Sequence, residues 1–280
     1  MPICSQKQIV FIAGASRGIG LATAYHLSQQ GYIVYGTYNK SQPPSDSITE
    51  SRITFFQMDI TDVDNIEKIV NQILSKESKV DVVINCAAIG IYGPAEEVSI
   101  EQAQNMFDVN VFGIMRVMQR VLPQFRKQGK GLIINISSMA ALDPIPGSDW
   151  YASSKYALEG LTESMASYLQ NQHIHLVLVE PGPVNTDFIS KSSQMADITL
   201  PDDPYNGMSE TVYYWHKKAL SKGQDPNEIA QLIEEIILTP LPQLRYQTSC
   251  DMQKIAQERY VDPSGNSFLE NKREFTNSLD

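Results

Sequence analysis

The chain has 280 residues, 42% of them hydrophobic, and its 22 Lys and Arg against 32 Asp and Glu give a formal net charge of −10. An acidic chain repels phosphate backbones, so nucleic acid is a poor candidate partner. The length suits one or two domains. We expect a single domain over residues 1–280, because no linker or change of composition divides the chain.

The cysteines and the N-terminus favour a reducing compartment. Cys4, Cys86 and Cys250 are odd in number and widely spaced, which is typical of neither a disulfide framework nor a zinc site. The apolar run that ends at Ala13 is too short for a signal peptide or a membrane span. We therefore expect a cytoplasmic protein with no metal and no transmembrane segment.

Short runs rich in Ile and Val recur along the first two thirds of the chain and are nearly continuous, as in strands buried on both faces. They lie at residues 9–13, 33–35, 53–56, 80–84, 132–136 and 174–179. Segments with helical spacing of apolar residues lie between them. This alternation predicts an α/β fold of Rossmann type, a doubly wound parallel sheet in three α/β/α layers.

The pattern changes after Pro181. Residues 190–205 are polar and have no clear period, which predicts a mobile insertion. A helix is expected over 208–220, and Asp225 and Pro226 predict the N-cap and first residue of another helix that continues to 237. We expect residues 187–222 to cover a substrate.

The first strand runs directly into Gly14-Ala15-Ser16-Arg17-Gly18-Ile19-Gly20, and an amphipathic helix follows. Glycines at such a turn let backbone N–H groups and the positive end of the helix approach a pyrophosphate. The sequence therefore predicts a dinucleotide site, although the spacing is G-x-x-x-G-x-G and not the more common G-x-G-x-x-G.

Tyr151 and Lys155 lie four residues apart, which places them on one face of a helix. A neighbouring ammonium favours tyrosinate, so we expect a lowered phenol pKa and a tyrosine that exchanges protons near neutral pH. Ser138 follows the fifth predicted strand, at the edge where open α/β sheets bind ligands. The three residues together predict acid–base catalysis.

The motif order resembles the short-chain dehydrogenase/reductase family of the single-domain, NAD(P)-dependent type, over residues 8–188 at least. The motifs are the Gly14–Gly20 turn, Asp59, Asn85-Cys86-Ala87-Ala88, Asn110, Ser138, Tyr151 with Lys155, and Pro181-Gly182. Weaker motifs resemble the hydroxysteroid and retinol dehydrogenase branch; they are Leu158-Glu159-Gly160-Leu161, Pro181-Gly182-Pro183-Val184, Leu244-Arg245-Tyr246 and Asp262-Pro263-Ser264-Gly265.

The resemblance implies a hydride transfer between a nicotinamide and an alcohol or carbonyl carbon. Tyr151 exchanges the proton, Ser138 holds the substrate oxygen, Lys155 also binds the nicotinamide ribose, and Asn110 holds a water that links Lys155 to solvent. The expected cofactor-binding residues are Gly14, Ser16, Arg17, Gly18, Ile19, Gly20, Asn39, Lys40, Asp59, Ile60, Asn85, Ala87, Pro181, Gly182, Val184 and Thr186.

Two departures from the family pattern concern the cofactor turn. The family usually has Thr where this chain has Ala13, and Asn-Ala-Gly where it has Cys86-Ala87-Ala88. Both changes remove polar groups that brace the turn, so we expect weaker cofactor binding. Cys86 is interpreted as a small buried hydrophobe and not as a reactive thiol.

The end of the second strand favours NADP(H), with NAD possible. An NAD site places a carboxylate there, for the ribose 2′-hydroxyl. This chain has Asn39 and Lys40 instead, and Arg17 adds a second cation that suits a 2′-phosphate.

Apolar residues on both sides of the expected crevice predict a lipophilic alcohol or ketone as substrate. The resemblance implies a steroid or a retinoid, and another fatty or polycyclic carbonyl compound is the alternative. The candidates are Leu142, Ile145, Pro146 and Trp150 on one side, and Phe188, Met195, Met208, Val212, Tyr213 and Trp215 on the other. The four histidines are interpreted as structural.

Two other functions compete with a dehydrogenase. A catalytically inactive NADP(H)-binding sensor or scaffold has the same fold, but it does not need the set Asn110, Ser138, Tyr151 and Lys155. A sugar-nucleotide epimerase of the related class carries a larger substrate domain. The resemblance also implies a homodimer or homotetramer.

Overall fold

A computed structural model describes residues 8–43, 53–259 and 261. Within this part a seven-stranded sheet, with all strand pairs parallel, forms the centre of the molecule in the order β3-β2-β1-β4-β6-β7-β9. Its strands are β1 (Ile9–Ala13), β2 (Ile33–Tyr38), β3 (Ile53–Gln57), β4 (Val82–Asn85), β6 (Gly131–Ile136), β7 (Ile174–Glu180) and β9 (Arg245–Gln247).

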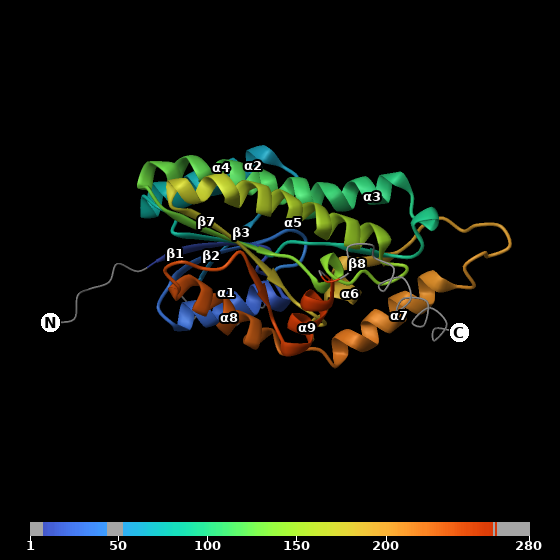
Figure 1. The fold of residues 1–280 in the computed structure, drawn as a ribbon. Helices are drawn as coiled ribbons and strands as arrows, with labels where there is room; N and C mark the ends of the chain where they lie inside the picture. The colour runs from blue at the N-terminus through green and yellow to red at the C-terminus, as the bar shows by residue number, and fades with distance from the viewer. Residues whose placement is uncertain (1–7, 44–52, 260, 262–280) are drawn as a thin grey trace.

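Helices cover both faces of this sheet (Figure 1). Helices α2 (Val63–Glu77), α4 (Ile114–Gln128) and α5 (Asp149–Leu169) pack on one face, and α1 (Gly18–Gln29) and α8 (Pro226–Leu238) pack on the other. The remaining helices are α3 (Ile100–Phe107), α6 (Phe188–Ser192), α7 (Met208–Ser221) and α9 (Cys250–Arg259). The predicted three-layer Rossmann-type fold is confirmed.

The central strands are buried on both faces because helices pack against each side. All five residues of β1 and all four of β4 are buried. Their side chains divide between two apolar clusters: Phe11 joins the cluster under α2, α4 and α5, whereas Val10 and Ile12 join the one under α1 and α8. This explains why the strand sequences are continuously apolar and do not alternate.

Aspartates cap two of the covering helices, and the predicted helix start at Asp225 and Pro226 is confirmed. The carboxylate of Asp62 caps α2 by accepting from the backbone N–H groups of Asp64 and Asn65. Asp225 caps α8 by accepting from Asn227, with Pro226 as the first helical residue. Both caps satisfy N–H groups that a helix start leaves without a partner.

Three short strands lie outside the predicted set. The sequence stretch 190–205 was expected to be irregular, but β8 (Ser193–Met195) pairs in parallel with β5 (Gly90–Tyr92), so the expectation is wrong for these residues. Strand β9 extends the main sheet beside β7. Each of these strands has only three residues, which is too few to show a period, and the strands they pair with are distant in sequence.

Cys4, the motif 262–265 and the charged segment 270–274 lie outside the described residues. No helix within the described part is both long and apolar enough to cross a membrane.

Candidate active site

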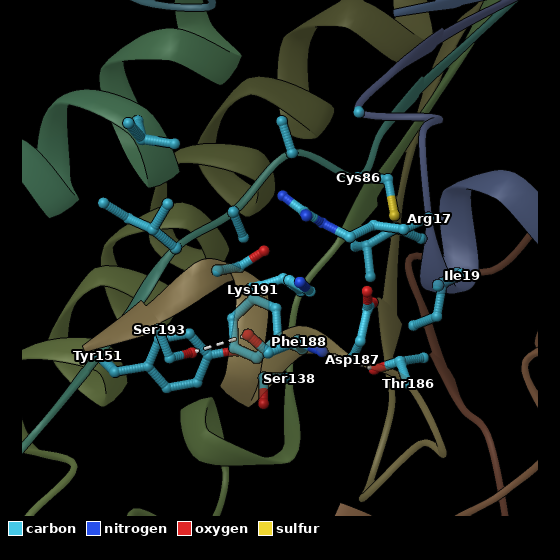
Figure 2. Close-up of a pocket in the computed structure, with 18 of the residues that line it drawn as sticks. Arg17, Ile19, Cys86, Ser138, Tyr151, Thr186, Asp187, Phe188, Lys191 and Ser193 are labelled. Carbon is cyan, nitrogen blue, oxygen red and sulfur yellow. Dashed lines mark hydrogen bonds between the residues drawn. The ribbon is translucent and has the colours of Figure 1, made fainter. Parts of the chain in front are cut away.

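A cavity of about 690 Å³ lies where the carboxyl ends of the parallel strands meet α5, α6 and α7. Figure 2 shows Arg17, Ile19, Cys86, Ser138, Tyr151 and Thr186 around it. The predicted site residues that line it are Gly14, Ser16, Arg17, Gly18, Ile19, Asn39, Lys40, Asp59, Ile60, Ala87, Ser138, Tyr151, Lys155, Pro181, Gly182, Val184 and Thr186. Gly20, Asn85 and Asn110 are buried and are not part of the lining.

The glycine turn has the shape of a phosphate cradle. Gly14 has a φ of +87°, and a Cβ there would lie 2.6 Å from the backbone nitrogen of Ala87. Gly18 has a φ of +53°, and a Cβ there would meet the Thr186 side chain at 3.2 Å. These positions need glycine, and the backbone at the start of α1 stays open to an anion. The turn therefore fits the diphosphate of a dinucleotide.

Thr37 of β2 braces this turn. Its hydroxyl accepts a hydrogen bond from the Gly14 backbone N–H at 3.0 Å, and its carbonyl oxygen accepts from Ala15 at 2.7 Å. A threonine side chain from the neighbouring strand thus supports the turn in this chain, which has Ala13 at the family's threonine position. The sequence did not indicate Thr37, because a threonine inside a strand is ordinary.

The adenosine end of the cavity has cations and no carboxylate at the end of β2. Asn39, Lys40 and Ser41 follow that strand and line the cavity. Arg17 reaches the same edge, where its Nη1 donates to the Ser41 hydroxyl at 3.2 Å. This arrangement fits an additional phosphate on the ribose.

The proposed catalytic side chains come from α5 and the end of β6. Tyr151 and Lys155 lie one turn apart on α5, and Ser138 follows β6 within hydrogen-bonding reach of the Tyr151 phenol. Lys155 is 2% exposed, and its Nζ donates to the carbonyl oxygen of Ile136 at 3.0 Å. One oxygen atom of a substrate can therefore contact both Ser138 and Tyr151.

The expected lowering of the Tyr151 pKa is wrong. Burial raises the pKa of Tyr151 to about 12, although the hydrogen bond with Ser138 acts in the opposite direction. Burial also lowers the pKa of Lys155 to about 8. The Lys155 ammonium lies 5.9 Å from the centre of the Tyr151 ring and donates to a backbone carbonyl, so removal from water dominates over attraction between the two groups.

Asn110 is fully buried in a π-helical turn, η3 (Asp108–Gly113). Its amide contacts both backbone groups of Ile89: Oδ1 accepts from the N–H and Nδ2 donates to the carbonyl, each at 2.9 Å. Nδ2 also donates to Ser154 at 3.1 Å, and Ser154 donates to the Tyr151 carbonyl at 2.7 Å. The side chain thus ties the chain after β4 to α5. The predicted water relay stays a prediction.

Asn85 and Gly20 occupy the packed interior behind the cavity. The Asn85 amide donates to Asn135 Oδ1 at 2.7 Å, which joins β4 to β6. A Cβ on Gly20 would lie 2.0 Å from the Gly14 carbonyl oxygen, so this glycine allows α1 to begin close to the turn. Both residues support the cavity from behind its wall.

The substrate end differs from the predicted wall. Of the ten candidates, Ile145, Phe188 and Trp215 line the cavity. Leu142 and Val212 are buried, and Trp150 packs against Phe107 instead. The other four candidates, Pro146, Met195, Met208 and Tyr213, also lie outside the lining.

Tyr92 and His216 also line the cavity, and neither was predicted. Tyr92 comes from β5, and the centres of the Tyr92 and His216 rings are 4.3 Å apart. The His216 Nδ1 contacts the Val212 carbonyl at 2.9 Å, and burial lowers the pKa of His216, so the imidazole is neutral near pH 7. Cys86 also lines the cavity, and burial raises the pKa of its thiol to about 11, which agrees with the predicted inert role.

A family model described as short chain dehydrogenase matches residues 8–197. The chain belongs to the short-chain dehydrogenase family. It is 35% identical to a 3-ketodihydrosphingosine reductase of Bacteroides thetaiotaomicron, over 86% of this chain and 87% of that protein. It is 33% identical to human retinol dehydrogenase 8, over 95% of this chain and 89% of the relative.

The solved structures agree with this assignment. A short-chain dehydrogenase from Streptomyces avermitilis is 25% identical with a TM-score of 0.81, and the match covers 98% of this chain and 100% of that one. Curated relatives include retinol dehydrogenases and 17-beta-hydroxysteroid dehydrogenases, so the chain is an NAD(P)-dependent oxidoreductase of the hydroxysteroid and retinol dehydrogenase-like branch.

Proposed function

We propose that this protein interconverts a lipophilic primary or secondary alcohol and its carbonyl compound, with NADP(H) as the cofactor. The observation that carries the proposal is the convergence of Ser138, Tyr151 and Lys155 at the inner end of a cavity that begins at a phosphate-binding turn. When bound, a nicotinamide supplies or accepts the hydride in this chemistry.

The residues divide the remaining work. Ser138 donates a hydrogen bond to the substrate oxygen, where negative charge develops during carbonyl reduction. Tyr151 gives that oxygen a proton in reduction and takes one back in oxidation. Lys155 keeps a positive charge beside Tyr151 below about pH 8 and is fixed by the Ile136 carbonyl. Asn110 holds α5 against the chain that follows β4.

The cations Arg17 and Lys40, together with Asn39, support NADP(H) over NAD(H) as the preferred cofactor. Equilibrium titration of cofactor fluorescence is expected to give a lower Kd for NADPH than for NADH. An equal or lower Kd for NADH contradicts the preference, but it leaves the catalytic proposal intact.

The proposed substrate is an extended apolar molecule with its carbonyl or hydroxyl at the inner end. Tyr92, Ile145, Phe188, Trp215 and Leu220 line that part of the cavity, and residues 187–222 serve as its cover. Steroid ketones and retinal are the first candidates. The similarity to a 3-ketodihydrosphingosine reductase supports adding long-chain ketones to a screen. Homo-oligomerisation and a cytoplasmic location stay predictions.

The deciding experiment measures NADPH oxidation with steroid ketones, retinal and long-chain carbonyl compounds for the wild type and for Tyr151→Phe. The variant retains the aromatic ring but lacks the hydroxyl group that exchanges the proton. We therefore expect turnover to fall by about a thousandfold or more while NADPH still binds. Retained turnover contradicts the acid–base role of Tyr151. Cofactor binding without turnover of any substrate in the wild type favours the inactive scaffold.

A further inference from the structure

A buried ionic cluster lies directly behind the active site and outside the cavity. Glu159 on α5 is 6% exposed and Glu180, at the end of β7, is fully buried. The Arg245 guanidinium of β9 contacts both: Nε lies 3.2 Å from Glu159 Oε2 and 3.3 Å from Glu180 Oε1. Buried charges are costly unless they are paired. An arrangement of two carboxylates on one guanidinium therefore needs a reason.

The cluster continues a series of contacts between α5 and the end of β6. Tyr151, Lys155 and Glu159 lie on successive turns of α5. Tyr151 contacts Ser138, Lys155 donates to the Ile136 carbonyl, and Glu159 Oε1 accepts from the Ser137 hydroxyl at 2.7 Å. Three consecutive residues, 136 to 138, are thus held by three consecutive turns. Glu159 fixes the residue immediately before Ser138.

The C-terminal part of the described chain reaches the same place. β9 pairs with β7, with Glu180 opposite Gln247, and the Gln247 amide donates to Glu180 Oε2 at 2.5 Å. Farther along, Met252 of α9 packs on Gly182, where a Cβ would lie 2.9 Å from its sulfur. The β9–α9 segment therefore contacts both the ionic cluster and the Pro181-Gly182 turn of the cavity wall.

The charge of the cluster balances when Glu180 carries a proton. Burial and the neighbouring Glu159 raise the pKa of Glu180 to about 7. The charged groups that face it are Glu159 from α5 and Arg245 from β9, and Lys155 lies one turn from Glu159. A protonated Glu180 leaves one carboxylate and one guanidinium in the interior, whereas its ionisation adds a second buried negative charge.

We propose that Arg245, Glu159 and Glu180 form a positioning unit through which the C-terminal strand β9 aligns Ser138 with Tyr151. This inference rests on the proposed function, because the alignment matters for the reaction assigned to those two residues. None of the three residues touches the cavity, so they act on turnover through Ser137 and α5.

Arg245→Met tests the unit because it removes the guanidinium that contacts both buried carboxylates. We expect kcat to fall about tenfold or more at pH 8 but only about threefold at pH 6, where Glu180 can take up a proton. The Kd for NADPH should stay within about threefold of the wild type. Adding Glu180→Gln removes one carboxylate, so the double variant should recover most of the kcat lost at pH 8.

Glu163→Gln is the matched control. Glu163 lies 3.1 Å from the same arginine, but its side chain is 60% exposed, and we expect kcat within about twofold at either pH. A purely structural role of Arg245 predicts an equal loss at both pH values and no recovery with Glu180→Gln, and that result overturns the proposal. Normal kcat in a folded Arg245→Met variant overturns it as well.

If Arg245→Met fails to fold, Ser137→Ala supplies the test, since it removes the hydrogen bond to Glu159 and takes away a single oxygen atom from the cavity wall. We expect kcat about fivefold lower with an unchanged Kd for NADPH. An unchanged kcat in this variant contradicts the proposal.

The pH dependence of the protein's Tm tests the presence of the cluster even if the wild type turns over no substrate. The unfolded chain loses the Glu180 proton at a lower pH than the folded chain, so this contribution to the wild-type Tm declines as pH rises from about 4.5 to about 7. Glu180→Gln should remove that decline. If it does not, the buried carboxyl pair is absent in solution, which separates this failure from failure of the proposed function.

Discussion

Tyr151 and Lys155 have shifted pKa values for the same reason, which is removal of a titrating group from water. Burial disfavours the charged form of each residue, so the phenol holds its proton up to about pH 12 and the ammonium releases its proton above about pH 8. At neutral pH the tyrosine is therefore protonated, which is the form that reduction of a carbonyl requires.

This residue-scale chemistry predicts a direction of pH dependence. The kcat/KM for carbonyl reduction should be nearly constant below pH 8 and fall above it, because Lys155 then loses the charge that supports Tyr151. The measurement is a pH–rate profile with NADPH, accompanied by cofactor titrations over the same range to exclude loss of binding. A reduction rate that increases from pH 7 to pH 9 contradicts this role of Lys155.

The π-helical turn η3 acts as an element that joins two parts of the site. An extra residue per turn re-aims a side chain within a helix, and such turns often occur at functional sites. Here the turn directs Asn110 inward, where one amide satisfies the N–H and the carbonyl of Ile89 and reaches Ser154. Buried backbone groups are costly when they lack a partner.

Asn110→Ala should therefore reduce both stability and turnover. We expect the free energy of unfolding to drop by roughly 2–4 kcal/mol, because the N–H and the carbonyl of Ile89 both lose their side-chain partner. Urea denaturation and kcat measure the two effects. Asn71→Ala, at an exposed position of α2, is the control and should cost less than about 0.5 kcal/mol. Equal effects of the two substitutions would falsify the bracing role.

At the scale of the whole molecule, the local charge at one end of the cavity is opposite in sign to the net charge. The chain carries a formal charge of −10, yet Arg17 and Lys40 stand at the adenosine end of the cavity. Short-range contacts with these cations favour a 2′-phosphate, and dissolved ions screen such partly exposed contacts. Cofactor choice is thus a local property that the overall acidity does not reveal.

The ratio of the NADH Kd to the NADPH Kd should accordingly fall as NaCl is raised from about 20 mM to about 300 mM. The double variant Arg17→Gln with Lys40→Gln should lose most of the preference at every salt concentration. Lys127→Gln with Lys130→Gln changes the net charge equally at exposed positions at the opposite ends of the strands, and it should retain the preference. A preference that is independent of salt and of Arg17 contradicts this explanation.

The sequence alone determined six of the seven strands of the main sheet, the helices that cover it and the spacing of the proposed catalytic residues, because these depend on local patterns. Continuous Ile and Val runs indicate buried parallel strands, Asp62 and Asp225 cap their helices, and a four-residue spacing places Tyr151 and Lys155 on one helix face. Only the tertiary structure decided the pairing of β5 with β8, the brace from Thr37, and the cluster of Glu159, Glu180 and Arg245, since their partners are distant in sequence. It also decided the direction of the Tyr151 pKa shift, because burial depends on all the elements packed around a residue and not on its neighbours along the chain.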